Sequence, residues 1–520
     1  MMKSRDEILG ALRDDPVFWD VIVIGGGATG LGAAVDSAAR GYRTILLEQS
    51  DFSKGTSSRS TKLIHGGVRY LQQGNVRLVL EALRERGILL QNAPHLVHNL
   101  PFVVPNYDWW EGPFYGMGLK IYDMLSGRFG LGPSMHISRE ETLKRIPTLE
   151  SGGLRGGIIY HDAQFDDARL AVNLAQTLAD LGGTPVNYMQ VTHLLKAKGG
   201  VDGVVARDME GGGEIEIRGR VAVNATGVFT DAILRMDDPA IPDCVVPSQG
   251  VHIVLDKTFL PSESAIMVPH TADGRVLFAV PWHDRVVVGT TDTPVAKVSL
   301  EPRPLREEID FLLTHAARYL TRDPSESDVL STFAGLRPLV RTGNDLDTAS
   351  LSREHAVQVS GSGLVTITGG KWTTYRKMGE DVINTAAEVA GLDARRPATD
   401  QLRIHGWLKH KADVYPRDVY GTDIVGLKKI ASENPALGEP IHPKLFYQAS
   451  EVIWSVRHEW ARTVEDVLAR RTRALFLDAR ASIEAAPAVA RLMAEELGRD
   501  PSWEAEQVQK YLELAEGYLP

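Results

Sequence analysis

The chain is nearly free of cysteine: Cys244 is the only one in 520 residues. One thiol can form neither a disulfide framework nor a cysteine-rich metal site, so we expect no metal and a reducing compartment such as the cytoplasm. Cys244 itself is expected to be a small buried apolar residue.

Long hydrophobic runs and a basic excess are also missing. No stretch reaches the about 18 apolar residues of a membrane-spanning helix, and residues 1–19 are too charged for a signal peptide. The formal net charge is −10, which argues against nonspecific nucleic-acid binding because a polyanion needs a basic surface. A small anionic substrate stays open, since a few buried arginines can reverse the field locally.

A glycine-rich turn lies between a predicted strand and a predicted helix in residues 20–49. Gly25, Gly27 and Gly30 form G-x-G-x-x-G, which permits a tight turn, close backbone approach to a pyrophosphate and close helix–strand packing. Glu48 ends the next predicted strand, 18 residues after Gly30, where a carboxylate can accept hydrogen bonds from ribose hydroxyls. The pattern predicts a dinucleotide site with phosphates at the helix N-terminus.

The nucleotide motif alone leaves the cofactor open between FAD and NAD. A polar, glycine-rich run, DFSKGTSSRSTKLIHGG, follows it, and further glycine turns occur at 225–227 and 369–371. These features suit a large cofactor extended across the sheet. No second G-x-G-x-x-G in a strand–helix context supplies a nicotinamide site, so we predict FAD.

Hydrophobic patterns divide the chain into three parts. Residues 20–49, 218–234 and 355–390 each predict strand, glycine turn and helix, and together they could form one sheet. Residues 240–350 alternate in short β patterns typical of an antiparallel sheet. From about 396 onward, helical spacing predominates.

We therefore predict an α/β protein with a Rossmann-like FAD-binding domain, an inserted antiparallel-sheet substrate or cap domain, and a C-terminal helical domain. The predicted ranges are 18–94, 151–235 and 350–395 for FAD binding, 95–150 and 236–349 for the cap, and 396–520 for the helical domain.

Several longer motifs resemble those of one family. TSSRSTKLIHGGVRYLQ, VNATGVF, VVVGTTDT, AGLRPL and GGKWTTYRK resemble the FAD-dependent (aerobic, respiratory) glycerol-3-phosphate dehydrogenases, in the D-amino-acid oxidase-like flavoprotein group. The resemblance covers essentially the whole chain, including ARTVEDVLARRTRALF near the C-terminus. It departs at Trp372, where the family usually has leucine after the motif lysine, and this affects only the packing beside the flavin.

This resemblance implies oxidation of sn-glycerol 3-phosphate to dihydroxyacetone phosphate, with hydride transfer from C2 to flavin N5 and electrons passed to membrane quinone. It also implies monotopic, peripheral attachment to the inner face of the cell membrane. The family often forms homodimers, although no stretch here identifies an interface. Three alternatives stay open: an oxidase of the same substrate that releases hydrogen peroxide, an amino-acid oxidase, and a noncatalytic FAD-binding module.

Predicted cofactor contacts continue from the glycine turn into the loop that follows and return at the two later glycine turns. They are Gly25, Gly27, Ala28, Thr29, Gly30, Glu48, Gln49, Thr56, Ser57, Ser58, Lys62, Leu63, His65, Gly66, Gly227, Gly370, Lys371, Trp372 and Thr373.

The resemblance also points to substrate contacts for Arg69, Tyr70, Arg337 and Arg353, with Lys371 beside them. Planar guanidinium groups suit a phosphate dianion because they can bind it in bidentate fashion. A lone arginine is more often a solvated surface charge. Arg69 follows a double glycine beside the cofactor loop and Arg337 lies in the apolar run FAGLRPLV, which favours a site for both.

Three residues are predicted to act in catalysis. His252 is the preferred base for the C2 hydroxyl proton because histidine titrates near neutral pH, although a structural histidine is nearly as plausible. His65 competes for this role. Lys371 precedes a predicted helix at 372–390, where its charge can face the flavin N1/C2 carbonyl edge. Arg337 and Lys371 could instead polarise the forming carbonyl oxygen.

The segment YDWWEGPFYGMGLKIYDML, residues 107–125, is rich in aromatic residues and methionine, with Lys120 and Arg128 nearby. This composition suits an interfacial membrane anchor. Buried packing within the cap domain is equally compatible with it.

Overall fold

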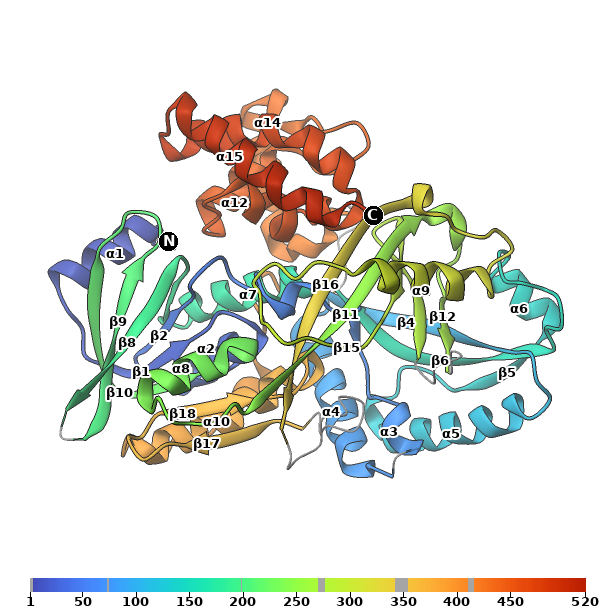
Figure 1. Cartoon of the computed structure of the whole chain (residues 1–520), viewed down its shortest axis with the longest axis horizontal. Helices are drawn as coiled ribbons and strands as arrows, with labels where there is room; N and C mark the ends of the chain where they lie inside the picture. The colour runs from blue at the N-terminus through green and yellow to red at the C-terminus, as the bar shows by residue number, and fades with distance from the viewer. Residues whose placement is uncertain (1–2, 73, 198, 270–275, 342–353, 410–415) are drawn as a thin grey trace.

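The computed structural model describes residues 3–520 except 73, 198, 270–275, 342–353 and 410–415, and not the side chains of Arg69 and Gln72. Figure 1 shows two sheets side by side, with a bundle of helices from the C-terminal part of the chain lying across them. The predicted fold class is confirmed. No helix among the described residues combines the length and apolar character needed to cross a membrane.

The first sheet is mainly parallel and begins with the predicted strand before the glycine turn. In order, its strands are β17 (Ala356–Val359), β18 (Val365–Thr368), β10 (Glu214–Asn224), β1 (Trp19–Ile24), β2 (Thr44–Leu47) and β7 (Thr184–Val186). The hairpin of β8 (Met189–Ala197) and β9 (Gly200–Asp208) joins β10. Because β10, β1 and β2 run parallel, their carboxyl ends meet at one edge, where ligands bind in such sheets.

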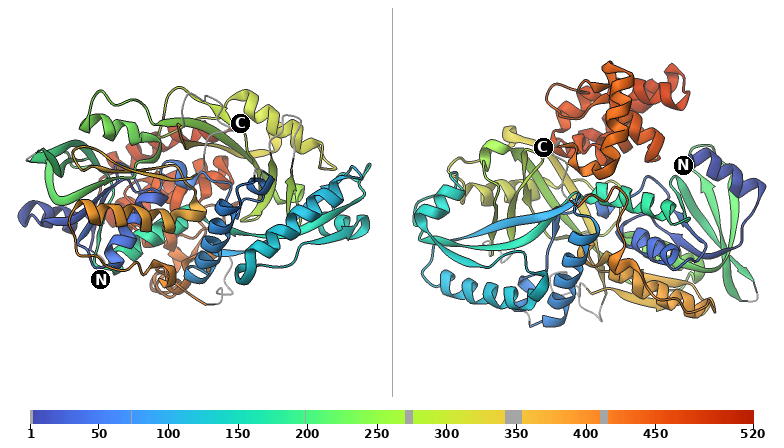
Figure 2. Two further views of the ribbon diagram at one scale, coloured as in Figure 1. Left: turned by 90° about the horizontal axis from the view of Figure 1, so that it is seen from below. Right: turned by 180° about the vertical axis from the view of Figure 1, so that it is seen from behind.

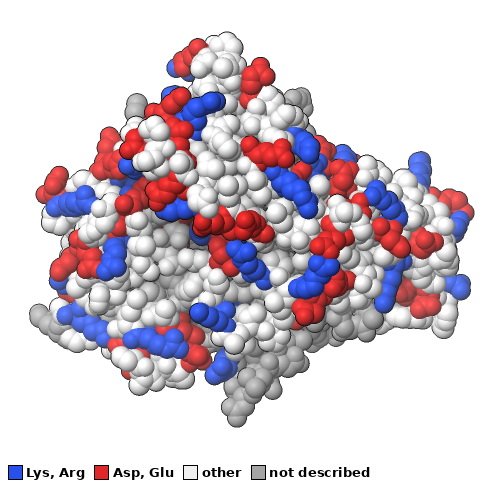
Figure 3. All heavy atoms as spheres, turned by 45° about the horizontal axis from the view of Figure 1, so that its top comes forward, with Lys and Arg blue, Asp and Glu red and all other residues white. Residues whose placement is uncertain are grey.

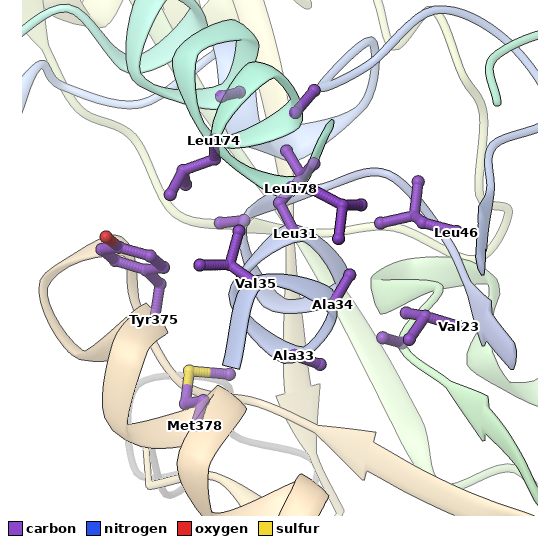
Figure 4. Packing of buried hydrophobic residues seen from close by; sticks show 14 of the residues in the cluster. Val23, Leu31, Ala33, Ala34, Val35, Leu46, Leu174, Leu178, Tyr375 and Met378 are labelled. Carbon is purple, nitrogen blue, oxygen red and sulfur yellow. The ribbon is translucent and has the colours of Figure 1, made fainter. Parts of the chain in front are cut away.

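Both faces of this sheet are buried. Val21 and Val23 pack against helices, whereas Ile22 and Ile24 pack on the opposite face against the hairpin and α1 (Arg5–Asp14). Figure 4 shows the helical face, where α2 (Ala28–Ala39) lies between α7 (Asp167–Asp180) and α10 (Tyr375–Val389). Burial on both faces explains why the four residues of β1 from Val21 to Ile24 form an uninterrupted apolar run.

The second sheet is mostly antiparallel. In order, its strands are β15 (Thr293–Pro294), β11 (Val245–Asp256), β14 (Arg285–Gly289), β13 (Leu277–Trp282), β12 (Ala265–Val268), β4 (Val97–Asn106), β6 (Gly156–Phe165) and β3 (Leu63–Ile64). β16 (Val329–Val340) pairs with β11, and β5 (Met135–Ser138) pairs with β6. Helix α9 (Arg306–Ala317) covers one face of this sheet, and α5 (Glu111–Ser126) covers the other.

Strand β6 differs from the sequence-based domain assignment. It lies in the range 151–235 assigned to the FAD-binding domain, yet it pairs with β4 along its whole length. Its sequence GGIIYHDAQF is apolar enough for either sheet, so only the long-range pairing places it. This pairing draws the boundary near residue 166. Cys244 is half-buried rather than buried, and its thiol contacts Asp231 at 2.9 Å.

The C-terminal part is helical, as predicted. Its helices are α11 (Ile424–Glu433), α12 (Ala449–His458), α13 (Ala474–Leu477), α14 (Ala479–Leu497) and α15 (Pro501–Ala515). Between α12 and α13 the chain forms a π-helical turn (Asp466–Arg471), and Trp460 and Arg473 adopt left-handed backbone conformations. Figure 2 shows this domain from two further directions, and its core includes Val254 and Phe333 of the second sheet.

The remaining helices support the two sheets. They are α3 (Arg69–Gln72), α4 (Val76–Asn92), α6 (Arg139–Arg145) and α8 (Thr230–Asp237).

Candidate active site

A cavity of about 1120 Å³ lies where the two sheets meet. Its lining combines the β1–α2 turn, the loop at residues 53–61 and the turn at 369–373 with residues of β11 and β16. This volume exceeds the roughly 300–1,000 Å³ of a usual small-molecule site. It can therefore accept a dinucleotide together with a small substrate.

The glycine turn has the geometry that a pyrophosphate requires. Gly25 has φ +108°, and a Cβ at Gly30 would lie 1.9 Å from the Gly25 carbonyl oxygen, so the start of α2 rests directly on the strand end. Gly27 is the N-cap of α2 and lines the cavity with Ala28 and Thr29. The positive end of the helix thus faces the cavity, and Gly27 itself places no side chain there, which fits FAD.

Glu48 lines the same cavity at the end of β2, together with Gln49. Its carboxylate accepts hydrogen bonds from the backbone N–H groups of Gly26 (2.6 Å) and Ser50 (2.9 Å). Burial raises the pKa of Glu48, and the two backbone donors oppose that rise. The carboxyl group is therefore fixed in place, as an acceptor for ribose hydroxyls must be.

The loop after β2 splits into lining and supporting residues. Its lining members, among the predicted cofactor contacts, are Thr56, Ser57, Leu63 and His65. Ser57 bridges two turns: its hydroxyl accepts the Ala28 N–H (2.9 Å), and its carbonyl accepts the Trp372 indole N–H (2.8 Å). Trp372 thus holds the loop through a hydrogen bond that leucine lacks.

Four predicted cofactor residues lie behind the lining: Gly30, Ser58, Lys62 and Gly66. The Lys62 ammonium is fully buried and donates to the Ser58 carbonyl (2.8 Å) and to Asp167 (2.7 Å). Burial lowers the pKa of Lys62 to about 7, against the attraction of Asp167. The Gly66 N–H donates to the Tyr122 hydroxyl (2.8 Å). These contacts support the cavity wall from outside.

The turn at the start of α10 brings a cation to the cavity. The turn lines the cavity with Gly370, Lys371, Trp372 and Thr373, and the earlier glycine turn does so with Gly227. The Lys371 ammonium lies 3.8 Å from the centre of the Tyr70 ring, within cation–π distance. Trp372–Thr374 form a 3-10 turn, so α10 begins at Tyr375 rather than at the predicted residue 372.

The double glycine at 66–67 has a structural reason. Gly67 has φ +76°, and a Cβ there would lie 2.4 Å from the Tyr70 ring. The glycine therefore lets the Tyr70 ring fold back over the backbone and reach the cavity. Arg69 is the first residue of α3, with its side chain outside the described part of the chain, and Arg353 also lies outside it.

His252 lines the cavity from β11 and is buried. Its Nε2 lies 2.9 Å from the Thr61 hydroxyl, and its ring stacks on Phe333 at 4.7 Å. Burial, together with the nearby charges of Lys62 and Arg337, lowers the pKa of His252 well below its ordinary value. The imidazole is therefore neutral near pH 7 and keeps a lone pair.

Arg337 reaches the cavity from β16, which pairs with β11. Its guanidinium donates to the Thr290 hydroxyl (3.0 Å), the Thr291 carbonyl (3.0 Å) and the Asp292 carboxylate (3.3 Å). These three partners were not among the predicted site residues. The motif VVVGTTDT contains all of them and was the available signal.

Asp162 was also missed, and it lines the cavity together with Thr61, which lies in the loop predicted to continue the cofactor cradle. Asp162 accepts hydrogen bonds from the Tyr122 hydroxyl (2.9 Å) and from Arg86 (2.6 Å) behind the Gly66 turn. The three segments involved are distant in sequence, so no local pattern could have grouped them. Across the described residues, no cluster of three His, Cys, Asp or Glu side chains is arranged to hold a metal ion.

Comparison with known proteins gives two family matches. Residues 20–376 match the FAD dependent oxidoreductase family. Residues 367–507 match the C-terminal domain of alpha-glycerophosphate oxidase.

Individual relatives agree with these matches. Mitochondrial glycerol-3-phosphate dehydrogenase of Mus musculus is 40% identical and covers 99% of this chain and 75% of its own length. The Schizosaccharomyces pombe protein of the same name is 37% identical, with coverages of 99% and 89%. The crystal structure of glycerol-3-phosphate dehydrogenase from Bacillus halodurans, complexed with FAD, superposes with a TM-score of 0.81 at 28% identity, covering 99% and 98%.

Proposed function

Because this chain belongs to the family of FAD-dependent glycerol-3-phosphate dehydrogenases, we propose that it oxidises sn-glycerol 3-phosphate at C2 to dihydroxyacetone phosphate and passes the electrons to a membrane quinone. The observation that carries the proposal is one cavity lined by both a dinucleotide cradle and the cationic residues Arg337 and Lys371. A dianionic substrate requires such cations.

The residues divide the chemistry among them. Bound FAD supplies the acceptor for the hydride that leaves C2. Arg337 binds the substrate phosphate, and Lys371 stabilises negative charge where electrons arrive. His252 accepts the hydroxyl proton. Its lowered pKa keeps the imidazole neutral, so that one ring nitrogen has a lone pair for the proton. Tyr70, beside Lys371, lines the part of the cavity that we assign to the substrate. Binding of the substrate phosphate by Arg69 and Arg353 stays a prediction.

A membrane acceptor is supported by helix α5. Its residues Phe114, Met117, Ile121 and Met124 are spaced three or four apart and are all exposed. Its other face packs into the second sheet through Tyr115. Residues 107–125 therefore have one face packed against the sheet and one apolar face exposed to solvent. An exposed apolar helix face suits the interface of a bilayer.

The apolar part of the cavity points to the same region. Phe102, Tyr160 and Met267 line the cavity and share one core cluster with Tyr115 and Leu119 of α5. An apolar acceptor dissolved in the bilayer would find apolar surface between the helix and the active site. We propose peripheral attachment to the inner face of the cell membrane through α5. The homodimer stays a prediction.

One experiment tests substrate and acceptor in sequence. Glycerol 3-phosphate is added to the purified yellow protein without oxygen, and the long-wavelength absorbance of the oxidised flavin should disappear. A soluble quinone should then restore the colour rapidly. If oxygen restores it at least as fast, with stoichiometric hydrogen peroxide, the oxidase alternative replaces the quinone proposal. If the colour persists with glycerol 3-phosphate but bleaches with amino acids, the substrate proposal is wrong.

A further inference from the structure

The loop at residues 51–62 lies between the FAD cradle and the C-terminal helical domain. Its cavity-facing side carries Thr56 and Ser57. On its other side it meets the segment 465–476, which contains the π-helical turn and Arg473. We call these the cofactor loop (51–62) and the arginine segment (465–476).

The first set of contacts between them is ionic. Arg470 and Arg471 both pair with Asp51, and Lys54 pairs with Glu465 at 2.6 Å. Asp51, Arg470 and Arg471 are each at most 2% exposed. Burial would raise the pKa of Asp51, but the two arginines outweigh it and lower that pKa to about 2. The start of the loop is thus held by a fully charged, buried cluster.

The second set is centred on Ser58. The Arg473 guanidinium donates to the Ser58 carbonyl (2.7 Å) and to Asp167 (3.1 Å), and it also donates to the Ala469 carbonyl (2.7 Å). Lys62 donates to the same Ser58 carbonyl and the same carboxylate. Two basic side chains, Lys62 and Arg473, therefore hold the Ser58 carbonyl, and Arg473 belongs to the C-terminal domain.

Fixing Ser58 also fixes Ser57, which links the α2 N-terminus to Trp372. Both of these cavity walls therefore depend on a carbonyl that Arg473 holds from outside. Arg473 does not line the cavity. Its backbone is left-handed, with φ +66°, two residues after the π-helical turn ends at Arg471 and directly before α13.

We propose that Arg473 is a positioning residue for the cofactor loop, so that the C-terminal domain sets the affinity for FAD. The surface of this domain carries charges of both signs interspersed (Figure 3), whereas the arginines at 470, 471 and 473 are buried against the cofactor loop. The proposal rests on the FAD cofactor and not on the substrate or the acceptor proposed above.

The first test is Arg473→Lys. Lysine keeps the charge but lacks the planar fork that reaches Ser58, Asp167 and Ala469 together. The loss of a charged hydrogen bond predicts about tenfold weaker FAD binding, measured by the fluorescence of flavin released on dilution. At saturating FAD, kcat should return to within about twofold of the unaltered protein. Hydrogen exchange at residues 51–62 of the FAD-free protein should become faster.

The matched control is Arg457→Lys, which alters an exposed bidentate pair with Glu496 inside the same domain. It should leave FAD affinity unchanged. If Arg473→Lys lowers the melting temperature but leaves FAD affinity and loop exchange as they were, its role is merely structural and the proposal is wrong. If this variant does not fold, Arg470→Lys replaces it with the same readouts, and unchanged FAD affinity there overturns the proposal equally.

Discussion

Lys371 brings a positive charge into the cavity wall. Its ammonium lies against the Tyr70 ring in the cavity wall, and it has no equivalent elsewhere on that turn. We expect Lys371→Met to lower kcat about 100-fold or more, as loss of one preorganised charge commonly does. Stopped-flow reduction of the flavin by glycerol 3-phosphate measures this directly.

Lys377→Met is the control, because Lys377 lies on the following helix, α10, pairs with Glu380 and does not line the cavity. The kcat of the Lys377→Met enzyme should stay within about twofold of that of the unaltered protein. A Lys371→Met enzyme with unchanged kcat and only a raised KM would assign Lys371 to substrate binding alone.

His252 predicts a particular pH dependence. Because its pKa lies well below the ordinary histidine value, the neutral, basic form persists as the pH falls below 6.5. The plateau of kcat at saturating substrate should therefore extend below pH 6.5, with no loss at the ordinary histidine pKa. His252→Asn should lower kcat about 100- to 10,000-fold while FAD stays bound. A similar loss in His65→Asn, with His252→Asn nearly normal, would transfer the role of base to His65.

Residue identities could be predicted better than residue partners. Gly25, Glu48 and Lys371 follow predicted elements at fixed spacing, so their positions in the cavity could be anticipated from the sequence. Lys62 pairs with Asp167, and His252 contacts Thr61. Such partners come from segments far apart in the chain, and no local period encodes them.

Helix α5 packs one face against the second sheet and exposes apolar side chains on the other. Met117 is 69% exposed and Met124 is 81% exposed, although both are apolar. Burying such side chains in a bilayer gains about 1.5–3 kcal/mol each. The triple variant Met117→Ser, Ile121→Ser, Met124→Ser should therefore lower binding to phospholipid vesicles at least about tenfold. Turnover with a soluble acceptor should not change.

Met209→Ser is the matched control, since Met209 is exposed at 48% in the turn between β9 and β10. Equal vesicle binding by all three proteins would exclude α5 as the attachment site. The composition of residues 107–125 left two expectations open because it does not say which residues share a face. Helical periodicity decides this only once the helix is known to begin at Glu111.

At the scale of the whole molecule, polar contacts cross the predicted domain boundaries beside the shared apolar core. The fold class followed from hydrophobic periods and is confirmed, whereas the pairing of β6 with β4 departs from the predicted domain ranges. The helical spacing of the arginine segment reveals neither the left-handed backbone at Arg473 nor the buried partners Asp51 and Asp167. Arg169 and Glu459 form a further buried bidentate pair between the FAD-binding and helical domains. Such ion pairs are determined by the packing of domains, which a single sequence does not display.

One polar contact between the domains, that of His405 with two carboxylates, predicts that the free energy of unfolding depends on pH. His405 lies between Asp180, at the end of α7, and Asp423, before α11. Burial alone would lower the pKa of His405, but hydrogen bonds to the two carboxylates outweigh it and raise that pKa to about 9. The folded protein therefore holds this proton more tightly than the unfolded chain, whose histidine titrates near 6.5.

The contribution of protonated His405 to the free energy of unfolding is thus complete below pH 6.5, and it is lost as the pH rises through 9. It amounts to at most about 3 kcal/mol, reduced by solvent screening because Asp180 is half exposed. Between pH 6.5 and 9 the urea midpoint of the FAD-bound protein should fall relative to that of His405→Asn, a comparison in which the opposite contribution of Lys62 cancels. His193→Asn, an exposed change on β8, should keep it. If His405→Asn retains the full pH dependence, other groups produce it and this linkage between the domains is excluded.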